Sequence, residues 1–235
     1  MEEFMTGAFW LAVGQIIMID ILLGGDNAVV IALACRNLPA KQRTQGIIYG
    51  TIGAIVLRVI LIAFALALLA VPYLKIVGAA LLLWIGVQLL MPEGEEAHNI
   101  NPSDKLWGAV KTVIVADLVM SVDNVIAIAG AAQGAGQAHQ LPLVIFGLLV
   151  SIPIIVWGSQ IVLKLMERYP FIITLGAMLL GWIAGQMAYT DVALKGIRPE
   201  GKMYEYACAA AGAILVWVIG MWLQKRAEAQ KAKQI

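Results

Sequence analysis

The sequence predicts an all-α polytopic membrane protein with seven transmembrane helices, built from two inverted three-helix repeats plus one C-terminal helix. Three observations lead to this fold class. Hydrophobic residues make up 61% of the 235 positions, charged residues only 13%, and the mean hydropathy is +0.87, which excludes a soluble domain with one core. Seven apolar segments are each long enough to cross about 30 Å of hydrocarbon as a helix. A pattern of acidic and amide residues also occurs twice.

The seven apolar segments are separated by connections that contain turn-forming or charged residues. Ahead of the first segment stand Glu2 and Glu3 but no Lys or Arg, and no small-residue cleavage site follows. We therefore expect this segment to remain as a membrane span and not to be removed as a signal peptide. The segments cover residues 9–34, 46–70, 73–91, 107–131, 141–164, 171–189 and 205–223.

Basic residues are divided unequally when the connections are placed on alternate sides of a membrane. One side holds only Lys75, Lys195, Arg198 and Lys202. By the positive-inside rule the richer side is cytoplasmic, so we expect the N-terminus outside and the C-terminus inside. The formal net charge of +1 gives no reason to expect a nucleic acid partner. The basic residues of the richer side are Arg36, Lys41, Arg43, Lys105, Lys111, Lys164, Arg168, Lys225, Arg226, Lys231 and Lys233.

Two acidic motifs lie inside apolar segments at a spacing of 97 residues. In each motif an aspartate is followed six residues later by an Asp-Asn pair. A charged side chain at the bilayer centre costs on the order of 3 kcal/mol, so a motif that places such groups there twice indicates a function. The motif residues are Asp20, Asp26 and Asn27 in the first segment, and Asp117, Asp123 and Asn124 in the fourth.

The likeness between the two parts of the chain extends beyond the acidic motif. Tyr49-Gly50 aligns with Phe146-Gly147 at the same spacing, and further matches follow after a one-residue insertion. Because each unit contains three spans, the second enters the membrane from the opposite side, as in transporters that bind substrate at the repeat interface. A duplicated scaffold is the alternative, but it would not need costly residues in both copies. The later matches pair Gly78-Ala79, Trp84 and Gln88 with Gly176-Ala177, Trp182 and Gln186.

The repeats divide the chain into five predicted regions. The linker between the units is polar and turn-rich, and its acidic residues and His98 either sense metal or form a solvated hinge. The regions are the first three-helix repeat (1–91), a cytoplasmic linker (92–106), the second and inverted repeat (107–190), an extracytoplasmic loop (191–204), and the seventh helix with a basic cytoplasmic tail (205–235).

Helix geometry groups the polar side chains of each motif. A seven-residue step returns almost to the same helix face, so Asp20 and Asn27 share one stripe. Asp26 lies about 120° away from Asp20 round an unbroken helix, and Asp123 is placed in the same way in the second motif. Local unwinding at Gly24 and Gly25 would bring Asp26 into the same ligand shell. In the second copy Ser121-Val122 replaces the glycines, which favours a milder break. The second stripe consists of Asp117, Met120, Ser121 and Asn124.

Carboxylate and amide oxygens that converge away from water suit a hard divalent cation such as Mg²⁺, Ca²⁺ or Mn²⁺. The motifs contain no thiolate or imidazole for zinc or copper. The thioether of Met120 would tilt selectivity toward Mn²⁺ or Fe²⁺, although methionine is also a common apolar packer. No organic cofactor is expected.

Three further polar residues lie deep in the apolar segments. Arg58 is the basic residue farthest inside a span, and pairing with a motif carboxylate would reduce the negative charge of a metal-free site. Gln88 and Gln186 occupy matched positions on the third spans of the two units. They either form hydrogen bonds that orient the metal-ligating side chains, or they form hydrogen bonds between helices.

The two motifs, the duplication and the span order together resemble the TerC family of bacterial membrane proteins, in particular its short seven-span branch, which is similar to the LysE-type exporters. The resemblance covers essentially the whole chain. It implies Mn²⁺ efflux across the bacterial inner (cytoplasmic) membrane and a role in supplying metal to exported enzymes. Carried over onto matching positions, the metal ligands would be Asp20, Asp26, Asn27, Asp117, Asp123 and Asn124.

The sequence therefore predicts a divalent metal exporter, embedded in the lipid bilayer, that works by secondary transport coupled to protons. Two other functions compete with this one. A non-transporting partner could pass metal to secretion machinery. An intramembrane aspartyl protease also needs two aspartates on neighbouring spans, but Leu23 stands where its Gly-x-Gly-Asp signature requires glycine, and four carboxylates exceed what a shared-proton dyad needs. We expect a protein that is not an enzyme.

Overall fold

The computed structural model describes residues 14, 17–18, 25–69, 71–91, 101–133 and 140–231 of the chain. These residues form α-helices and one turn of 3-10 helix, and no β-strand occurs among them, which confirms the all-α fold class. The elements are a helix at Gly25–Cys35, α2 (Ala40–Leu69), α3 (Leu74–Leu90), α4 (Pro102–Gln133), α5 (Gln140–Arg168), α6 (Phe171–Tyr189), the 3-10 helix η4 (Val192–Leu194) and α7 (Lys202–Lys231).

Four stretches of the described helices are long and apolar enough to cross a membrane, and they lie in α2, α5, α6 and α7. Gly25–Cys35 and α3 are apolar but shorter. The seven-span count and the inversion of the second unit therefore stay predictions. The outer faces of the bundle carry large apolar side chains, among them Trp157, which is 69% exposed. Such faces are suited to contact with lipid tails, which are themselves apolar.

Two helices begin before the apolar segments that they contain, inside regions that the sequence assigns to connections. The predicted linker extends to residue 106, and α4 begins within it at Pro102, a residue favoured in the first helical turn because its missing N–H is not needed there. The backbone carbonyl of Asn101 accepts the first hydrogen bonds of this helix, from Asp104 and Lys105. The loop expected over 191–204 contains η4 and ends where α7 begins, at Lys202.

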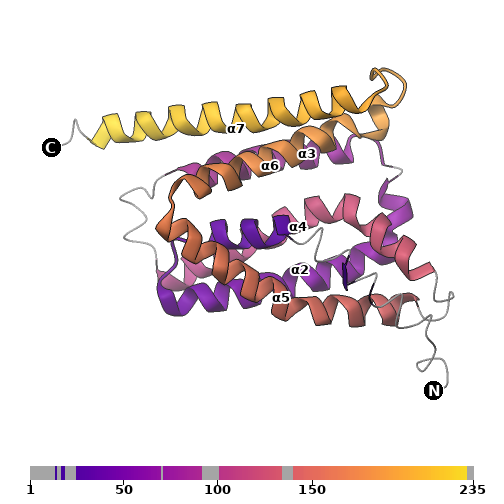
Figure 1. Cartoon of the computed structure of the whole chain (residues 1–235), viewed down its shortest axis with the longest axis horizontal. Coiled ribbons are helices and arrows are strands. Elements are labelled where there is room, and N and C mark those ends of the chain that lie inside the picture. The colour runs from indigo at the N-terminus through magenta and orange to yellow at the C-terminus, as the bar shows by residue number, and fades with distance from the viewer. Residues whose placement is uncertain are drawn as a thin grey trace.

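The helices pack in layers, shown in Figure 1. α7 lies on one outer side and contacts α6 and α3, while α2 and α5 lie on the opposite side. The helix Gly25–Cys35 and α4 run between these layers. Ala32, Leu33 and Cys35 of the central helix are almost completely buried, as expected of a helix that is apolar on all sides.

Connections that are far apart in sequence meet at two opposite ends of the bundle. At one end Arg43, near the start of α2, forms an ion pair with Glu167, near the end of α5. At the other end the carboxylate of Asp191, after α6, accepts hydrogen bonds from the backbone at the start of α3. Four basic residues belong to the segments that meet here, since Lys75 lies in the first turn of α3, Lys195 and Arg198 follow η4, and Lys202 begins α7. The side of the membrane that this end faces stays a prediction.

α3 and α6 bury matching faces, as expected of two related units. Gly78 of α3 lies against Val119 of α4, and Gly176 of α6 lies against Val29 and Leu33 of the central helix. A glycine at each position lets the neighbouring helix come close. Buried residues recur at an offset of 98 positions in the pairs Gly78 and Gly176, Ala79 and Ala177, Leu82 and Leu180, and Gly86 and Ala184.

Candidate metal site

The central helix places Asn27 in the interior of the bundle. Asn27 is 4% exposed, and neither its side-chain oxygen nor its side-chain nitrogen has a hydrogen-bond partner within the described part of the chain. An unsatisfied buried amide costs about 1–3 kcal/mol, so folded proteins rarely keep one without a reason. Asn27 is therefore a candidate binding residue.

α4 and α2 supply a buried polar cluster beside Asn27, formed by Asp117, Ser121 and Arg58. Arg58 is 2% exposed and Asp117 5% exposed, and the guanidinium Nη2 pairs with the carboxylate oxygen Oδ1. Arg58 Nε donates a hydrogen bond of 3.1 Å to Ser121 Oγ, and this hydroxyl donates one of 3.0 Å to Asp117 Oδ2. The pairing of Arg58 with a motif carboxylate is the one that its depth in the span predicts.

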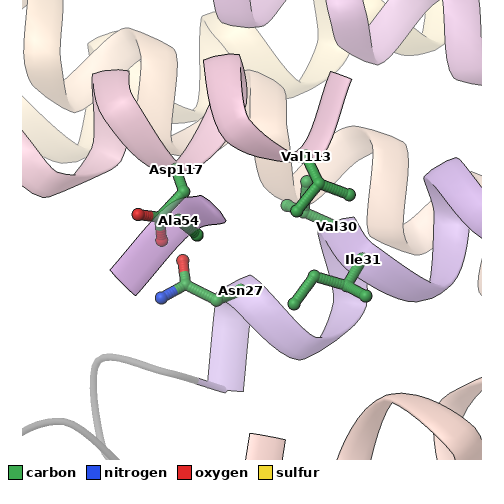
Figure 2. A pocket seen from close by; sticks show the side chains of 6 residues that line it. All are labelled: Asn27, Val30, Ile31, Ala54, Val113 and Asp117. Atoms are coloured by element: carbon green, nitrogen blue, oxygen red, sulfur yellow. The ribbon is translucent and has the colours of Figure 1, made fainter. Parts of the chain in front are cut away.

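A small cavity separates Asn27 from Asp117. Figure 2 shows the amide of Asn27 and the carboxylate of Asp117 with their ends turned toward one another at one side of it. The cavity has room for about one water-sized particle. Its lining combines these two polar side chains with an apolar wall. The lining residues come from the central helix, α2 and α4, and they are Asn27, Val30, Ile31, Ala54, Val113 and Asp117.

The chemistry of this cavity suits a small hard cation. Amide and carboxylate oxygens are ligands of Mg²⁺, Ca²⁺ and Mn²⁺, and an apolar wall strengthens the attraction between a cation and a carboxylate. The donors come from both sequence units, since Asn27 belongs to the first and Asp117 to the second. Among the described residues no group of three or more His, Cys, Asp or Glu side chains converges, so two oxygen-bearing side chains form the described part of the site.

Several predicted ligands lie outside the described residues or outside the cavity. Asp20 and Gly24 are not among the described residues, nor is the side chain of Asp123. Asp26 and Asn124 are half-buried and do not line the cavity. α4 continues as an unbroken helix through the second motif, in contrast to the mild break expected at Ser121-Val122.

Of the further candidate residues that the structure describes, Arg58 and Ser121 join the cluster, whereas Met120, Gln88 and Gln186 do not. Ser121 bridges Arg58 and Asp117. Met120 packs in an apolar cluster with Val30, Leu82 and Leu180, where its thioether serves as core. Gln88 is exposed on α3 and Gln186 is half-buried on α6, and neither lines the cavity.

Thr51 is a buried polar residue that the sequence pattern does not single out. It is 1% exposed, and its hydroxyl has no partner among the described residues. Ser151 and Ser159 on α5, by contrast, donate to the carbonyl four residues earlier, which is the usual arrangement in an apolar helix. Thr51 shares a face of α2 with Ala54 and Arg58, so its hydroxyl continues the polar face of the site along α2.

Comparison with known proteins places the chain in a family. The model of the family described as "Integral membrane protein TerC family" matches residues 5–228. The chain belongs to the TerC family. This confirms the resemblance stated from the motifs. It also supports a multi-pass membrane protein.

Relatives of the chain include proteins of Bacillus subtilis and Escherichia coli. Membrane protein YjbE of Bacillus subtilis is 46% identical over 176 residues, which cover 75% of this chain and 78% of YjbE. Membrane protein YceF of the same organism is 27% identical, covering 76% of this chain and 71% of YceF. Protein YegH of Escherichia coli is 25% identical, covering 74% of this chain but 36% of YegH. No solved structure matches the chain.

Proposed function

We propose that this TerC-family protein exports a divalent metal cation, with Mn²⁺ as the transported ion, and that it is a transporter and not an enzyme. The observation that carries the proposal is the buried amide of Asn27, which has no hydrogen-bond partner in the described part of the chain and lines one cavity with the carboxylate of Asp117, at a meeting point of the two sequence units. Transporters built from repeats bind substrate at such an interface. The choice of Mn²⁺ among hard cations rests on the family resemblance.

The repeat extends the proposal to the rest of the predicted ligand set. The cavity pairs the amide of one unit with the first aspartate of the other. The same relation in the other direction would pair Asn124 with Asp20, which lies outside the described residues. Asp26 and Asp123, on other helix faces, would then contact the ion before or after it occupies the central position. The ion would cross by secondary transport, with protons as the coupling ion.

The ion pair between Arg58 and Asp117 argues against the protease alternative. A catalytic aspartyl dyad works because two carboxylates share one proton at close range. Here Asp117 is bound by a guanidinium and a hydroxyl instead. A carboxylate that already binds the guanidinium of Arg58 is suited to exchanging this cation for a metal ion.

The direct test is uptake of radioactive Mn²⁺ into proteoliposomes that contain the purified protein, with and without a proton gradient. We expect saturable uptake that a proton gradient accelerates and that Asp117→Asn removes. The matched control is Asp104→Asn, which changes an aspartate in the exposed first turn of the same helix. Saturable binding without uptake would contradict transport and favour a partner that delivers metal to secreted enzymes.

Orientation in the inner membrane is tested separately with single cysteines in a variant without Cys35 and Cys208. Lys195→Cys is placed on the predicted extracytoplasmic side and Glu167→Cys on the cytoplasmic side, where Glu167 pairs with Arg43. An impermeant maleimide should label intact cells at position 195 and not at position 167. The reverse pattern would show that the charge asymmetry has been assigned to the wrong side.

A further inference from the structure

Asp117 is already engaged by a cation that belongs to the protein. One carboxylate oxygen pairs with Arg58, and the other accepts the hydroxyl of Ser121, which itself accepts a hydrogen bond from Arg58. A metal ion that entered the neighbouring cavity would find a carboxylate whose charge is compensated. It would also meet the positive field of the guanidinium, because arginine stays protonated in proteins.

The guanidinium and the metal therefore compete for one carboxylate. The amide of Asn27 has no hydrogen-bond partner within the described residues, so the metal displaces none of these residues when it binds the amide oxygen. Asp117 becomes an effective ligand when Arg58 withdraws from it. Arg58 is four residues beyond Ala54, a lining residue of the cavity, so its side chain starts one helical turn from the ion position. Its long side chain has several rotatable bonds, which lets the head group move while the helix stays in place.

We infer that Arg58 is an internal substitute cation: it leaves Asp117 when the metal binds and returns when the metal departs. This inference rests on the proposed function and adds a positioning residue to it. A buried carboxylate without any cation would be costly. With Arg58 returned, the metal-free site keeps a balanced ion pair, and the protein can pass through the conformations that reset it for the next metal ion.

The role predicts two separate effects of removing the guanidinium charge. In Arg58→Gln the metal no longer competes for Asp117, so Mn²⁺ should bind about tenfold more tightly or better. The metal-free protein should at the same time reset slowly, so net Mn²⁺ efflux should fall about tenfold while exchange of Mn²⁺ for Mn²⁺ across the membrane continues. A residue that only supports the fold would not raise affinity and would not separate exchange from net flux.

The experiment uses purified full-length protein for Mn²⁺ calorimetry and the same preparations in proteoliposomes for both kinds of flux. Arg58→Lys keeps a positive charge and should retain net efflux. Arg43→Gln, which breaks an exposed ion pair far from the cavity, is the matched arginine control and should behave as the wild type in all three measurements. Ser121→Ala weakens the hold on Arg58 without removing charge, so it should raise affinity by a smaller factor and serves if Arg58→Gln does not fold.

Equal Mn²⁺ affinity in the wild type, Arg58→Gln and Ser121→Ala would overturn the inference, whether or not the protein transports. Net efflux by Arg58→Gln at the wild-type rate would overturn the resetting role. A wild type that binds Mn²⁺ but carries none, together with tighter binding in Arg58→Gln, would contradict the proposed transport function and still support the competition for Asp117.

Discussion

The carboxylates of two buried aspartates in this protein receive their hydrogen bonds from different kinds of donor. Asp191 is 0% exposed, and its carboxylate accepts four backbone N–H groups at 2.7–3.2 Å. Asp117 is also buried but is held by two side chains, those of Arg58 and Ser121. Backbone donors are fixed by the fold, whereas a guanidinium and a hydroxyl can rotate away. We therefore assign a structural role to the carboxylate of Asp191, whereas the carboxylate of Asp117 has donors that can be exchanged.

The surroundings of Asp191 explain its structural role. Its carboxylate receives the N–H groups of Tyr73, Lys75 and Ile76 at the start of α3, and that of Ala193 in η4. Tyr73 adopts a left-handed conformation with φ of 66°, which is costly for a residue with a side chain. Asp191 thus caps a helix from a distant loop and stabilises a strained turn beside it. Burial alone would raise the pKa of the Asp191 carboxyl, but the four backbone hydrogen bonds hold this pKa below its ordinary value.

The largest effect is expected for Asp117→Asn. Loss of the carboxylate charge removes a proposed ligand, so Mn²⁺ transport should fall by more than about a hundredfold while the protein still inserts in the membrane. Transport of radioactive Mn²⁺ and the amount of protein in membrane fractions measure the two quantities. The sequence repeat predicts the same outcome for Asp20→Asn. Full protection of cells from Mn²⁺ by either variant would remove that aspartate from the site.

Asp191→Ala should affect stability and leave metal binding alone. The change leaves buried N–H groups without an acceptor, so the free energy of unfolding should fall by about 3 kcal/mol. Thermal unfolding followed by intrinsic tryptophan fluorescence measures the loss, and calorimetry checks that the Mn²⁺ affinity is unchanged. Asp104→Ala is the exposed control. A lower Mn²⁺ affinity with unaltered stability would reverse the roles assigned to the two aspartates.

The pH dependence of stability provides a finer test of Asp191. Because folding lowers the pKa of this carboxyl, its contribution is fully present above the ordinary value of about 4 and is lost as the pH falls through the lower folded value. The wild type should therefore lose stability more steeply than Asp191→Asn below about pH 4. Unfolding temperatures between pH 6 and pH 3 give both slopes. Parallel curves would mean that protonation of Asp191 is not linked to folding.

Arg43→Gln should have the smallest effect. Arg43 and Glu167 form an ion pair whose side chains are 31% and 57% exposed, and such pairs contribute less than about 1 kcal/mol because water and salt screen them. The unfolding temperature of the variant should stay close to that of the wild type in 0.15 M salt. A large loss would show that charges at this end of the bundle fasten α2 to α5.

The sequence singles out Asp117 as a buried, paired residue but gives no sign that Asp191 is buried. Asp117 stands out because it is a charge in an apolar segment and has a counterpart in the other unit. Asp191 follows a span, where an aspartate is unremarkable, and its partner Tyr73 lies 118 residues earlier in the chain. Contacts over such distances depend on how helices pack, which local patterns do not encode.

The limits of pattern reasoning are also visible within the site. The stripe that predicts Asp117 includes Met120, but helix periodicity cannot say whether a residue borders a cavity or fills the core, and Met120 fills the core. Charge and depth predict that Arg58 pairs with a carboxylate. They do not identify Ser121 as the bridge, nor Thr51 as a buried hydroxyl on the same face of α2 as Arg58. Hydropathy also does not locate helix ends, because α4 and α7 each begin with a polar turn ahead of the apolar stretch.

The central claim is that the cavity between Asn27 and Asp117 binds a divalent cation, and Asn27→Leu tests it most directly. Leucine has the same branching and the same number of side-chain heavy atoms as asparagine, and it needs no hydrogen bond. The variant should unfold about 3 °C higher than the wild type in the absence of metal, because it removes a buried amide that has no hydrogen-bond partner among the described residues. Addition of Mn²⁺ should raise the unfolding temperature of the wild type and leave that of Asn27→Leu unchanged. A variant that is less stable than the wild type and is still stabilised by Mn²⁺ to the same extent would contradict the account.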